Sequence, residues 1–424
     1  MKKRLPSIDR PAWKKQPFRP EEHESATLSL SLVHYKEMKF VLLWQQRSEK
    51  RRGERASRIG SLVEWDCNRR QNRRTGPAPF LIDLEPVYPK HEVQMDGIMQ
   101  SASSTWAPFR IAPYFSERVW GYHDLHPWYD RVAEGAPIGE AWLTGDQCVV
   151  TSGAHAGQAL GTLFADHTEA LLGPAAPRTG SPLLIKVLFV KEKLSVQVHP
   201  DDRMAQKYGD PRGTTECWYV LEAEPGAQVA CGLKPGVTLN EVKEGIAAGT
   251  LESSLNLLDV AVGEMIFVDA GTVHAIWPGS ILLETQQNCD LTYRMYDYGR
   301  GRELHIEKSL EATRLVTRAG KVPAKALRDR TILLDVEYFR VERIPVDGSR
   351  SSVSLADMDR PEPGLAYLFA AAGTGRIVGP GFEPVELPAR GIVGVPAATP
   401  AFTVEDAGGL DLIRITPNWP ASAQ

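Results

Sequence analysis

The segment KLSVQVHPDD places an amide and an imidazole on one side of a predicted strand. Side chains alternate between the faces of a strand, so Ser195, Gln197 and His199 point one way and the two valines between them point the other. An amide and an imidazole that share one face, with an apolar face behind them, indicate a polar site built on a folded core.

Two further segments supply a carboxylate and a second imidazole. In TTECWYVLEA, Glu216 is a lone carboxylate on an otherwise apolar strand, and such a buried charge is unfavourable without a cation. GEMIFVDAGTVHAI leads through a glycine turn to His274, a pattern similar to the metal-binding half-motif of cupin barrels, with Asp269 in place of proline. We predict that His199, Glu216 and His274, with Gln197 as a candidate fourth ligand, bind Zn²⁺ and leave a position open for substrate or water.

The segment ILLETQQNCDLTYRMYDYGR is dense in charged and amide side chains. If it runs extended, its apolar residues share one face, and the opposite face carries Glu284, Gln286, Asn288, Asp290, Thr292 and Arg294. Two carboxylates and a guanidinium ten residues or more after His274 indicate catalytic groups beside the metal. Two alternatives stay open: a half-exposed strand, or a turn at residues 288–290 that breaks the alternation.

The elements that must position these residues are mostly short strands. From about Thr105, β-rich runs bounded by Gly and Pro predict an all-β sandwich or barrel. Two helical inserts are predicted, TLNEVKEGIAAGTLESSLNLL with a Thr238 cap and LHIEKSLEATRLVTRAG. After about Gly320 a second β series follows, and because the last histidine is His305, the metal site belongs to the first series. We therefore divide the chain into residues 1–103, 104–320 and 321–424.

The composition excludes several classes of protein. A chain of 424 residues with 42% hydrophobic and 24% charged residues is neither disordered, collagen-like nor membrane-spanning. Residues 1–100 hold 20 Lys and Arg against 13 Asp and Glu, while the remainder is acidic. We interpret residues 1–103 as a basic, poorly ordered extension rather than a nucleic-acid-binding arm, since no recognition motif accompanies the charge. A translation start at Met95 or Met99 is an alternative.

Cysteine usage and the lack of long apolar runs predict a cytoplasmic protein. The five cysteines are scattered without a CxxC pair, which is typical of reduced thiols. Pro and charged residues interrupt the basic start before any signal-peptide core, and no run approaches the roughly 18 apolar residues of a membrane helix. We expect no membrane or nucleic-acid partner, and the oligomeric state is left open.

The chain resembles the type I phosphomannose isomerases (mannose-6-phosphate isomerases) of the short bacterial kind, zinc enzymes with tandem cupin domains. The resemblance extends from about Phe109 to Pro417. It rests on YFSERVWGY, IGEAW, SPLLIKVLFVKEKLSVQVHPDD, TECWYVLEAEPGA, DAGTVHAI, ETQQNCDLTYRMYDYGR and RELHIEKSLE. VQVHPDD, TECWY and TYRMYDY in this order are specific to the family. The resemblance implies a mainly β fold of two jelly-roll cupin barrels with a helical insert, of which the second, residues 321–424, is metal-free.

The resemblance also implies roles for individual residues. The family's zinc ligands fall on Gln197, His199, Glu216 and His274, which is the set predicted from strand alternation, with one Zn²⁺ per chain. Its active-site arginine falls on Arg294, and the remaining catalytic positions fall on Glu284, Asp290 and Lys186. The family usually has a lysine two residues before the glutamate ligand, where this chain has Thr214. We hypothesise that Arg212 or Lys207 supplies the missing charge.

The implied reaction interconverts mannose 6-phosphate and fructose 6-phosphate. Proton transfer between C1 and C2 passes through an enediolate that requires an electrophile and a base, and Glu284 and Asp290 are both candidates for the base. For the phosphate, Lys186 together with Arg294 or another basic residue is the candidate pair. Two alternatives remain: another metal-dependent cupin enzyme, or a non-catalytic sugar-phosphate-binding relative that kept the fold.

Overall fold

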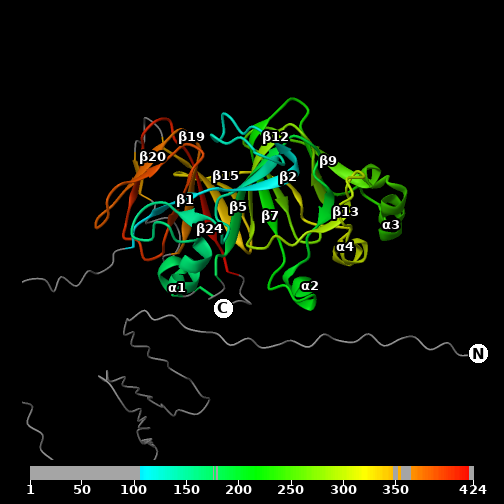
Figure 1. The fold of residues 1–424 in the computed structure, drawn as a ribbon, viewed down its shortest axis with the longest axis horizontal. Coiled ribbons are helices and arrows are strands. Elements are labelled where there is room, and N and C mark those ends of the chain that lie inside the picture. The colour runs from blue at the N-terminus through cyan, green and yellow to red at the C-terminus, as the bar shows by residue number, and fades with distance from the viewer. Residues whose placement is uncertain (1–105, 175, 178–179, 347–351, 355–363, 420–424) are drawn as a thin grey trace, which may run out of the picture. The chain divides into compact units, whose positions relative to one another are not determined.

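The described part of the chain is built mainly from antiparallel strands. The computed structural model describes residues 106–174, 176–177, 180–346, 352–354 and 364–419, so the predicted extension of residues 1–103 lies outside the described residues. Within these ranges the strands form four sheets with few helices (Figure 1). This confirms the mainly β prediction. None of the described helices is long and apolar enough to cross a membrane.

A seven-stranded and a five-stranded sheet carry the predicted metal ligands. The first runs in the order β14 (Gly320–Val322), β10 (Met265–Val268), β7 (Glu216–Ala223), β12 (Ser280–Gln287), β5 (Leu183–Val190), β3 (Ile138–Trp142) and β2 (Tyr114–Tyr122). The second runs β13 (Tyr293–Tyr296), β6 (Val196–Val198), β11 (His274–Ile276), β8 (Gln228–Leu233) and β9 (Leu255–Asp259). Trp218 and Val220 of β7 pack in one apolar cluster with β8 and β11, so the two sheets lie face to face.

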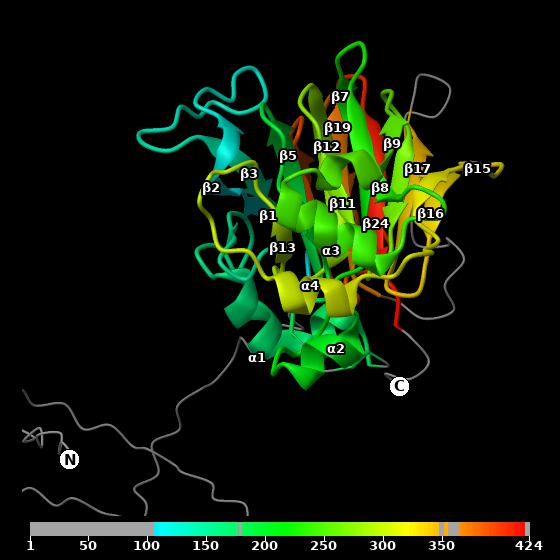
Figure 2. The ribbon, with the colours of Figure 1, turned by 90° about the vertical axis from the view of Figure 1, so that its right-hand side faces the viewer.

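Helices cover the outer face of the five-stranded sheet (Figure 2). Val242 and Ile246 of α3 (Leu239–Ala248) pack with Val196 and Val198 of β6, and Ala312 of α4 (Ile306–Ala312) joins the same cluster. The two valines of β6 therefore face the helices and hold the strand against them, while the other face of the strand carries Gln197.

The predicted start of α3 is confirmed, but the predicted lengths of both inserts are wrong. Thr238 and Glu241 form a capping box, and Gly249, with a φ of 69°, ends the helix. After the 3₁₀ turn η1 (Leu251–Ser254), the remainder of the insert is strand β9, because it pairs with β8. The second insert is helical only in α4. Helices α1 (Leu160–Leu172) and α2 (Asp202–Lys207) were not predicted.

An eight-stranded and a four-stranded sheet form the second half of the fold. The larger runs β15 (Lys325–Ala326), β16 (Thr331–Asp335), β17 (Phe339–Pro345), β24 (Asp411–Pro417), β19 (Ala366–Ala372), β22 (Ile392–Val395), β1 (Phe109–Ala112) and β4 (Val149–Val150). The smaller runs β18 (Ser352–Ser354), β23 (Thr403–Asp406), β20 (Gly375–Val378) and β21 (Val385–Leu387). Strands β1 and β4 thus join a sheet made mostly of residues after 320, and β14 spans the proposed division at residue 320.

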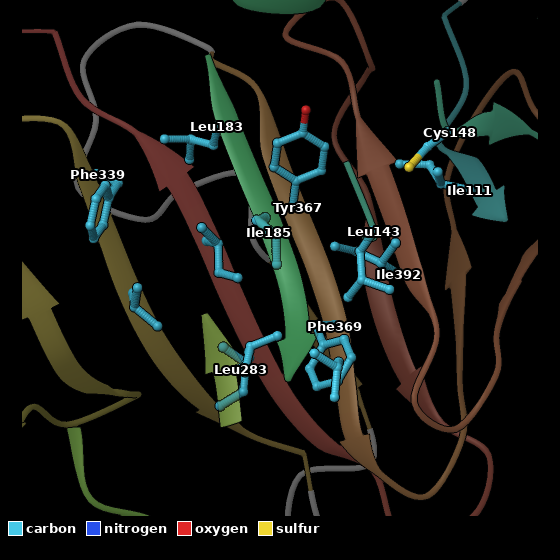
Figure 3. Close-up of a cluster of buried hydrophobic side chains, with 14 of the residues drawn as sticks. Ile111, Leu143, Cys148, Leu183, Ile185, Leu283, Phe339, Tyr367, Phe369 and Ile392 are labelled. Atoms are coloured by element: carbon cyan, nitrogen blue, oxygen red, sulfur yellow. The ribbon is translucent and has the colours of Figure 1, made fainter. Parts of the chain in front are cut away.

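The largest apolar cluster joins the two halves through their seven-stranded and eight-stranded sheets. Leu183, Ile185 and Leu283 come from the former, and Tyr367 and Phe369 come from β19 in the latter (Figure 3). Because these side chains are almost fully buried, the second half shields one face of the sheet that holds Glu216 and Glu284.

A buried ion-pair triad stabilises the second half. Glu342 is fully buried, its Oε1 lies 3.0 Å from Arg330 Nε, and its Oε2 lies 2.7 Å from Arg414 Nε on the paired strand β24. Glu342→Gln should lower the free energy of unfolding by about 3–5 kcal/mol, because two guanidiniums lose their buried counter-charge. Urea denaturation measures the change. Arg343→Gln, which breaks the exposed Arg343–Asp411 pair, is the control and should change it by less than about 1 kcal/mol. Equal effects of the two substitutions would contradict a structural role for the triad.

Candidate metal and active site

Three strands bring the predicted metal ligands together at one point. His199 follows β6, Glu216 begins β7, and His274 begins β11, where it lies opposite Gln197. His199 Nε2 lies 3.4 Å from Glu216 Oε2, and His274 Nε2 lies 3.5 Å from Glu216 Oε1. Two ligands of a tetrahedral Zn²⁺ ion lie about 3.3 Å apart, given bond lengths of about 2.0–2.1 Å. The spacing of the three side chains therefore fits one metal ion.

Hydrogen bonds fix both imidazoles with Nε2 toward the carboxylate. His199 Nδ1 lies 2.7 Å from the carbonyl oxygen of Leu291, and His274 Nδ1 lies 2.9 Å from that of Thr272. Each Nδ1–H donates to its carbonyl, which leaves the Nε2 lone pair for a metal. Glu216 Oε1 is buried without a hydrogen-bond partner. A cation between the three side chains would satisfy it.

The protonation of the cluster also suits a metal. Burial lowers the pKa of His274 to about 4, outweighing the attraction of Glu216, so this imidazole is neutral near pH 7. Burial alone would raise the pKa of Glu216, but His199 and His274 together hold it below its ordinary value. Burial alone would lower the pKa of His199, but Glu216 raises it overall, so this imidazole must release its proton when a metal binds. The set that remains is two nitrogen donors and an anionic oxygen.

Gln197 lies beside the cluster but does not present its oxygen to it. Its amide nitrogen is 3.2 Å from His274 Nε2, and its Oε1 accepts a hydrogen bond from the Ser195 hydroxyl at 3.2 Å. Gln197 would become the predicted fourth ligand only if its side-chain amide flipped, so that Oε1 faced His274 in place of the nitrogen.

A buried Lys–Glu pair stands next to the ligands. Lys186 of β5 and Glu284 of β12 are directly opposite in register, with Nζ 3.0 Å from Oε2. Trp218 donates its indole N–H to the other carboxylate oxygen of Glu284 at 3.0 Å. Burial raises the pKa of Glu284 above its ordinary value, an effect that Lys186 only partly offsets. Burial alone would lower the pKa of Lys186, but Glu284, Glu140 and Asp290 raise it overall, so the lysine is charged.

The segment from Glu284 to Arg294 is not one strand. The extended reading is therefore wrong, and the alternative in which the alternation breaks at residues 288–290 is the one observed. The chain leaves the seven-stranded sheet after Gln287 and enters the five-stranded sheet at Tyr293, and residues 288–292 between them belong to neither sheet. Asn288 is consequently directed away, donating to the Ser181 carbonyl at 3.1 Å. Asp290 is half exposed and lies 3.4 Å from Lys186 Nζ. Arg294 lies opposite Gln197 in register.

These groups surround a cavity of about 560 Å³. Seven of the eight predicted site residues line it: Gln197, His199, Glu216, Lys186, Glu284, Asp290 and Arg294. The eighth, His274, is buried next to Glu216. The arrangement combines a metal-binding cluster, a buried carboxylate and several cations in one space. Such a set can polarise a sugar oxygen and transfer a proton.

Comparison with known proteins assigns the chain to a family. Residues 109–228 match the family model described as phosphomannose isomerase type I, catalytic domain. A mannose-6-phosphate isomerase of Streptococcus mutans is 34% identical over 283 residues, covering 64% of this chain and 86% of the relative. A probable mannose-6-phosphate isomerase of Bacillus subtilis is 32% identical over 316 residues, covering 70% and 96%. The chain belongs to the type I phosphomannose isomerase family.

A solved structure agrees with this family assignment. The crystal structure of the mannose 6-phosphate isomerase from Bacillus subtilis superimposes with a TM-score of 0.65 at 28% identity, over 73% of this chain and 99% of that one. The sequence resemblance is thereby confirmed, and this phosphomannose isomerase family member is an enzyme rather than a binding protein that kept the fold.

Sequence reasoning missed several residues of the cavity in this phosphomannose isomerase. Arg118 and Trp120 of β2, Glu140 of β3 and Arg302 also line it. Arg118 contacts Glu140 at 2.9 Å and Asp290 at 3.6 Å, and Trp142 donates to Glu140 at 2.6 Å. Their segments carried the family resemblance, but only strand pairing between β2, β3 and β5 reveals that they reach the site.

The hypothesis that Arg212 or Lys207 replaces the family's lysine at position 214 is not supported. Thr214 is buried, and its hydroxyl donates to the Cys289 carbonyl at 3.3 Å. Lys207 pairs with Glu311, and both Arg212 and Lys207 line other cavities, because the loop after α2 turns away from the site. Arg118 and Arg302 are the additional cations that the cavity does contain.

The second departure from the family, Asp269, has a local explanation. Its carboxylate accepts a hydrogen bond from the Thr272 hydroxyl at 2.9 Å, inside the turn that precedes His274. In the same turn Gly271, with a φ of 87°, donates its N–H to the His199 carbonyl at 2.9 Å. Asp269 can therefore shape this turn in place of proline.

Proposed function

We propose that this chain is a zinc-dependent aldose–ketose isomerase that interconverts mannose 6-phosphate and fructose 6-phosphate through an enediolate. The observation that carries the proposal is the pairing of the His199–Glu216–His274 cluster with the buried Glu284–Lys186 pair in one cavity. The named activities of the relatives support the same substrate.

His199, Glu216 and His274 would hold the metal. When bound, Zn²⁺ would supply a Lewis acid for the oxygens at C1 and C2 of the sugar. Gln197 is the candidate fourth ligand, because its side-chain amide lies beside His274 Nε2. The unpartnered Glu216 Oε1 supports this assignment.

Glu284 is the general base in this proposal. Its carboxylate is buried, one oxygen is held by Trp218, and burial raises its pKa toward the working pH, which suits a group that must take and return a proton. Asp290 is half exposed and lies between Lys186 and Arg118. We assign Asp290 to substrate positioning, and Arg294 to holding the negatively charged sugar.

The proposed division of labour between the domains follows from the position of the site. All lining residues of the cavity precede residue 303. We propose residues 104–320 as the catalytic domain and residues 321–424 as a second, metal-free cupin domain that buries the back of the seven-stranded sheet.

An isotope experiment tests the reaction and its intermediate together. In D₂O, mannose 6-phosphate should yield fructose 6-phosphate that carries deuterium at C1, because the proton on the base can exchange with solvent before it is returned. Mass spectrometry of the product measures it. Product that stays free of deuterium even after many reversible turnovers would contradict the enediolate, and absence of fructose 6-phosphate would contradict the isomerase itself.

A further inference from the structure

The charges that line the cavity are separated by depth. Glu216, Glu284 and Lys186 have side chains that are at most 8% exposed, whereas Arg118 and Arg302 are each 27% exposed. The proposed metal and base thus lie at the buried end, and Arg118 and Arg302 lie toward the open end, where the side chain of Asp290 is 48% exposed and contacts Arg118. A sugar phosphate is divided in the same way, with its reacting C1 and C2 at one end and its dianion at the other.

Lys186 is poorly placed to bind that dianion. Its ammonium group already contacts Glu284 at 3.0 Å, Asp290 at 3.4 Å and Gln286 Oε1 at 2.7 Å. A side chain 5% exposed with these partners neutralises the carboxylates around the base. The earlier prediction of a Lys186–Arg294 pair for the phosphate therefore requires a different partner for Arg294.

Arg294 has unused hydrogen-bonding capacity. Its NH1 donates to the Glu303 carbonyl at 3.0 Å, and its Nε is buried without a partner. In the described ranges, no carboxylate lies within ion-pairing distance of it. Burial lowers the pKa of Arg294, and the positive charge of Arg302 lowers it further. The second contribution indicates that the two guanidiniums lie near each other.

Arg302 is held at the cavity by a buried carboxylate. Asp297 is 3% exposed, and its two oxygens accept from Arg302 Nε at 2.8 Å and NH2 at 2.5 Å. The loop between them turns through Gly299 and Gly301, both with a φ of 77°. The bidentate pair occupies one edge of the guanidinium and leaves the NH1 edge for a ligand.

We propose that Arg294 and Arg302 bind the phosphoryl group of the substrate, and that Asp297 is the positioning residue for Arg302. The inference rests on the proposed function and extends it to the recognition of the phosphate. Arg302 keeps its NH1 edge and Arg294 keeps its Nε for a ligand, and two guanidiniums that line one cavity with donors to spare suit a dianion, since each can donate charge-assisted hydrogen bonds.

The test measures binding of inorganic phosphate to the zinc-loaded, full-length protein by calorimetry at fixed ionic strength. Arg302→Gln should weaken binding about 10- to 100-fold, the worth of a charge-assisted hydrogen bond. The KM for mannose 6-phosphate should rise by a similar factor, with kcat changed less than about 3-fold, because the contact acts on ground state and transition state alike. Asp297→Asn should shift both quantities in the same direction.

Arg343→Gln is the matched control. Arg343 forms the same kind of bidentate pair, with Asp411, but lies on β17 outside this cavity. It should leave phosphate affinity and KM unchanged. The proposal is overturned if Arg302→Gln binds phosphate like the wild type while folding normally, or if Arg343→Gln weakens binding equally. Phosphate binding needs no turnover, so the two proposals can fail separately. If Arg302→Gln loses phosphate binding but the wild type does not isomerise mannose 6-phosphate, the isomerase proposal is rejected and the anion site is retained.

Discussion

Replacing His274 by alanine is expected to release the metal and lower kcat/KM by at least about 1,000-fold. The imidazole is buried, its Nδ1–H is committed to the Thr272 carbonyl, and its Nε2 faces Glu216 at 3.5 Å. Removing it leaves only two strong ligands, and Lewis-acid stabilisation worth several kcal/mol is lost with the metal. Metal analysis of the purified variant, together with an isomerase assay, measures both effects.

His199→Ala should behave like His274→Ala, since each imidazole provides one side of the cluster. The control is His123→Ala, because His123 is exposed and lies outside the cavity, so metal content and rate should stay at wild-type values. A His274→Ala protein that keeps one zinc ion per chain and full activity would refute the ligand assignment.

Glu284→Gln is expected to keep the metal and lower kcat by about 100- to 10,000-fold. Glutamine preserves the shape of the side chain and can still accept the hydrogen bond of Trp218, but it cannot remove a proton from carbon. Single-turnover measurement of the isomerisation rate, on protein with verified zinc content, separates this effect from loss of binding.

The matched control for Glu284→Gln is Glu222→Gln on the same sheet. Glu222 also accepts a hydrogen bond from an indole, that of Trp128 at 2.7 Å, but it does not line the cavity. Asp290→Asn provides the competing test. If Asp290→Asn abolished turnover while Glu284→Gln stayed active, the base would be Asp290.

The alternation of side chains accounts for how much of the site could be predicted from the sequence. In VQVHP, one face of β6 holds Gln197 and leads to His199, and the valines of the other face pack against α3. This pattern needs only local geometry, so it is visible in one segment. The alternation failed at Asn288, because the chain there changes sheets and the parity of a strand ends with the strand.

The parts that could not be predicted depend on pairing between distant segments. Leu255–Asp259 follows a helix and looks like its continuation, yet it is strand β9 because β8 supplies a partner. Arg118 reaches the cavity because β2 pairs with β3, and β3 pairs with β5, which carries Lys186. Likewise β1 belongs to the eight-stranded sheet through its contact with β22, nearly 300 residues later. Composition and periodicity contain no information about such partners.

The proposed isomerase activity depends on a metal held by His199, Glu216 and His274. The most direct measurement follows the conversion of mannose 6-phosphate to fructose 6-phosphate by protein dialysed against a chelator, before and after addition of one equivalent of Zn²⁺. We predict that the metal-free protein isomerises mannose 6-phosphate at least about 100-fold more slowly, and that added zinc restores the original rate. Full turnover by protein shown to contain no metal would contradict a metal-dependent isomerase.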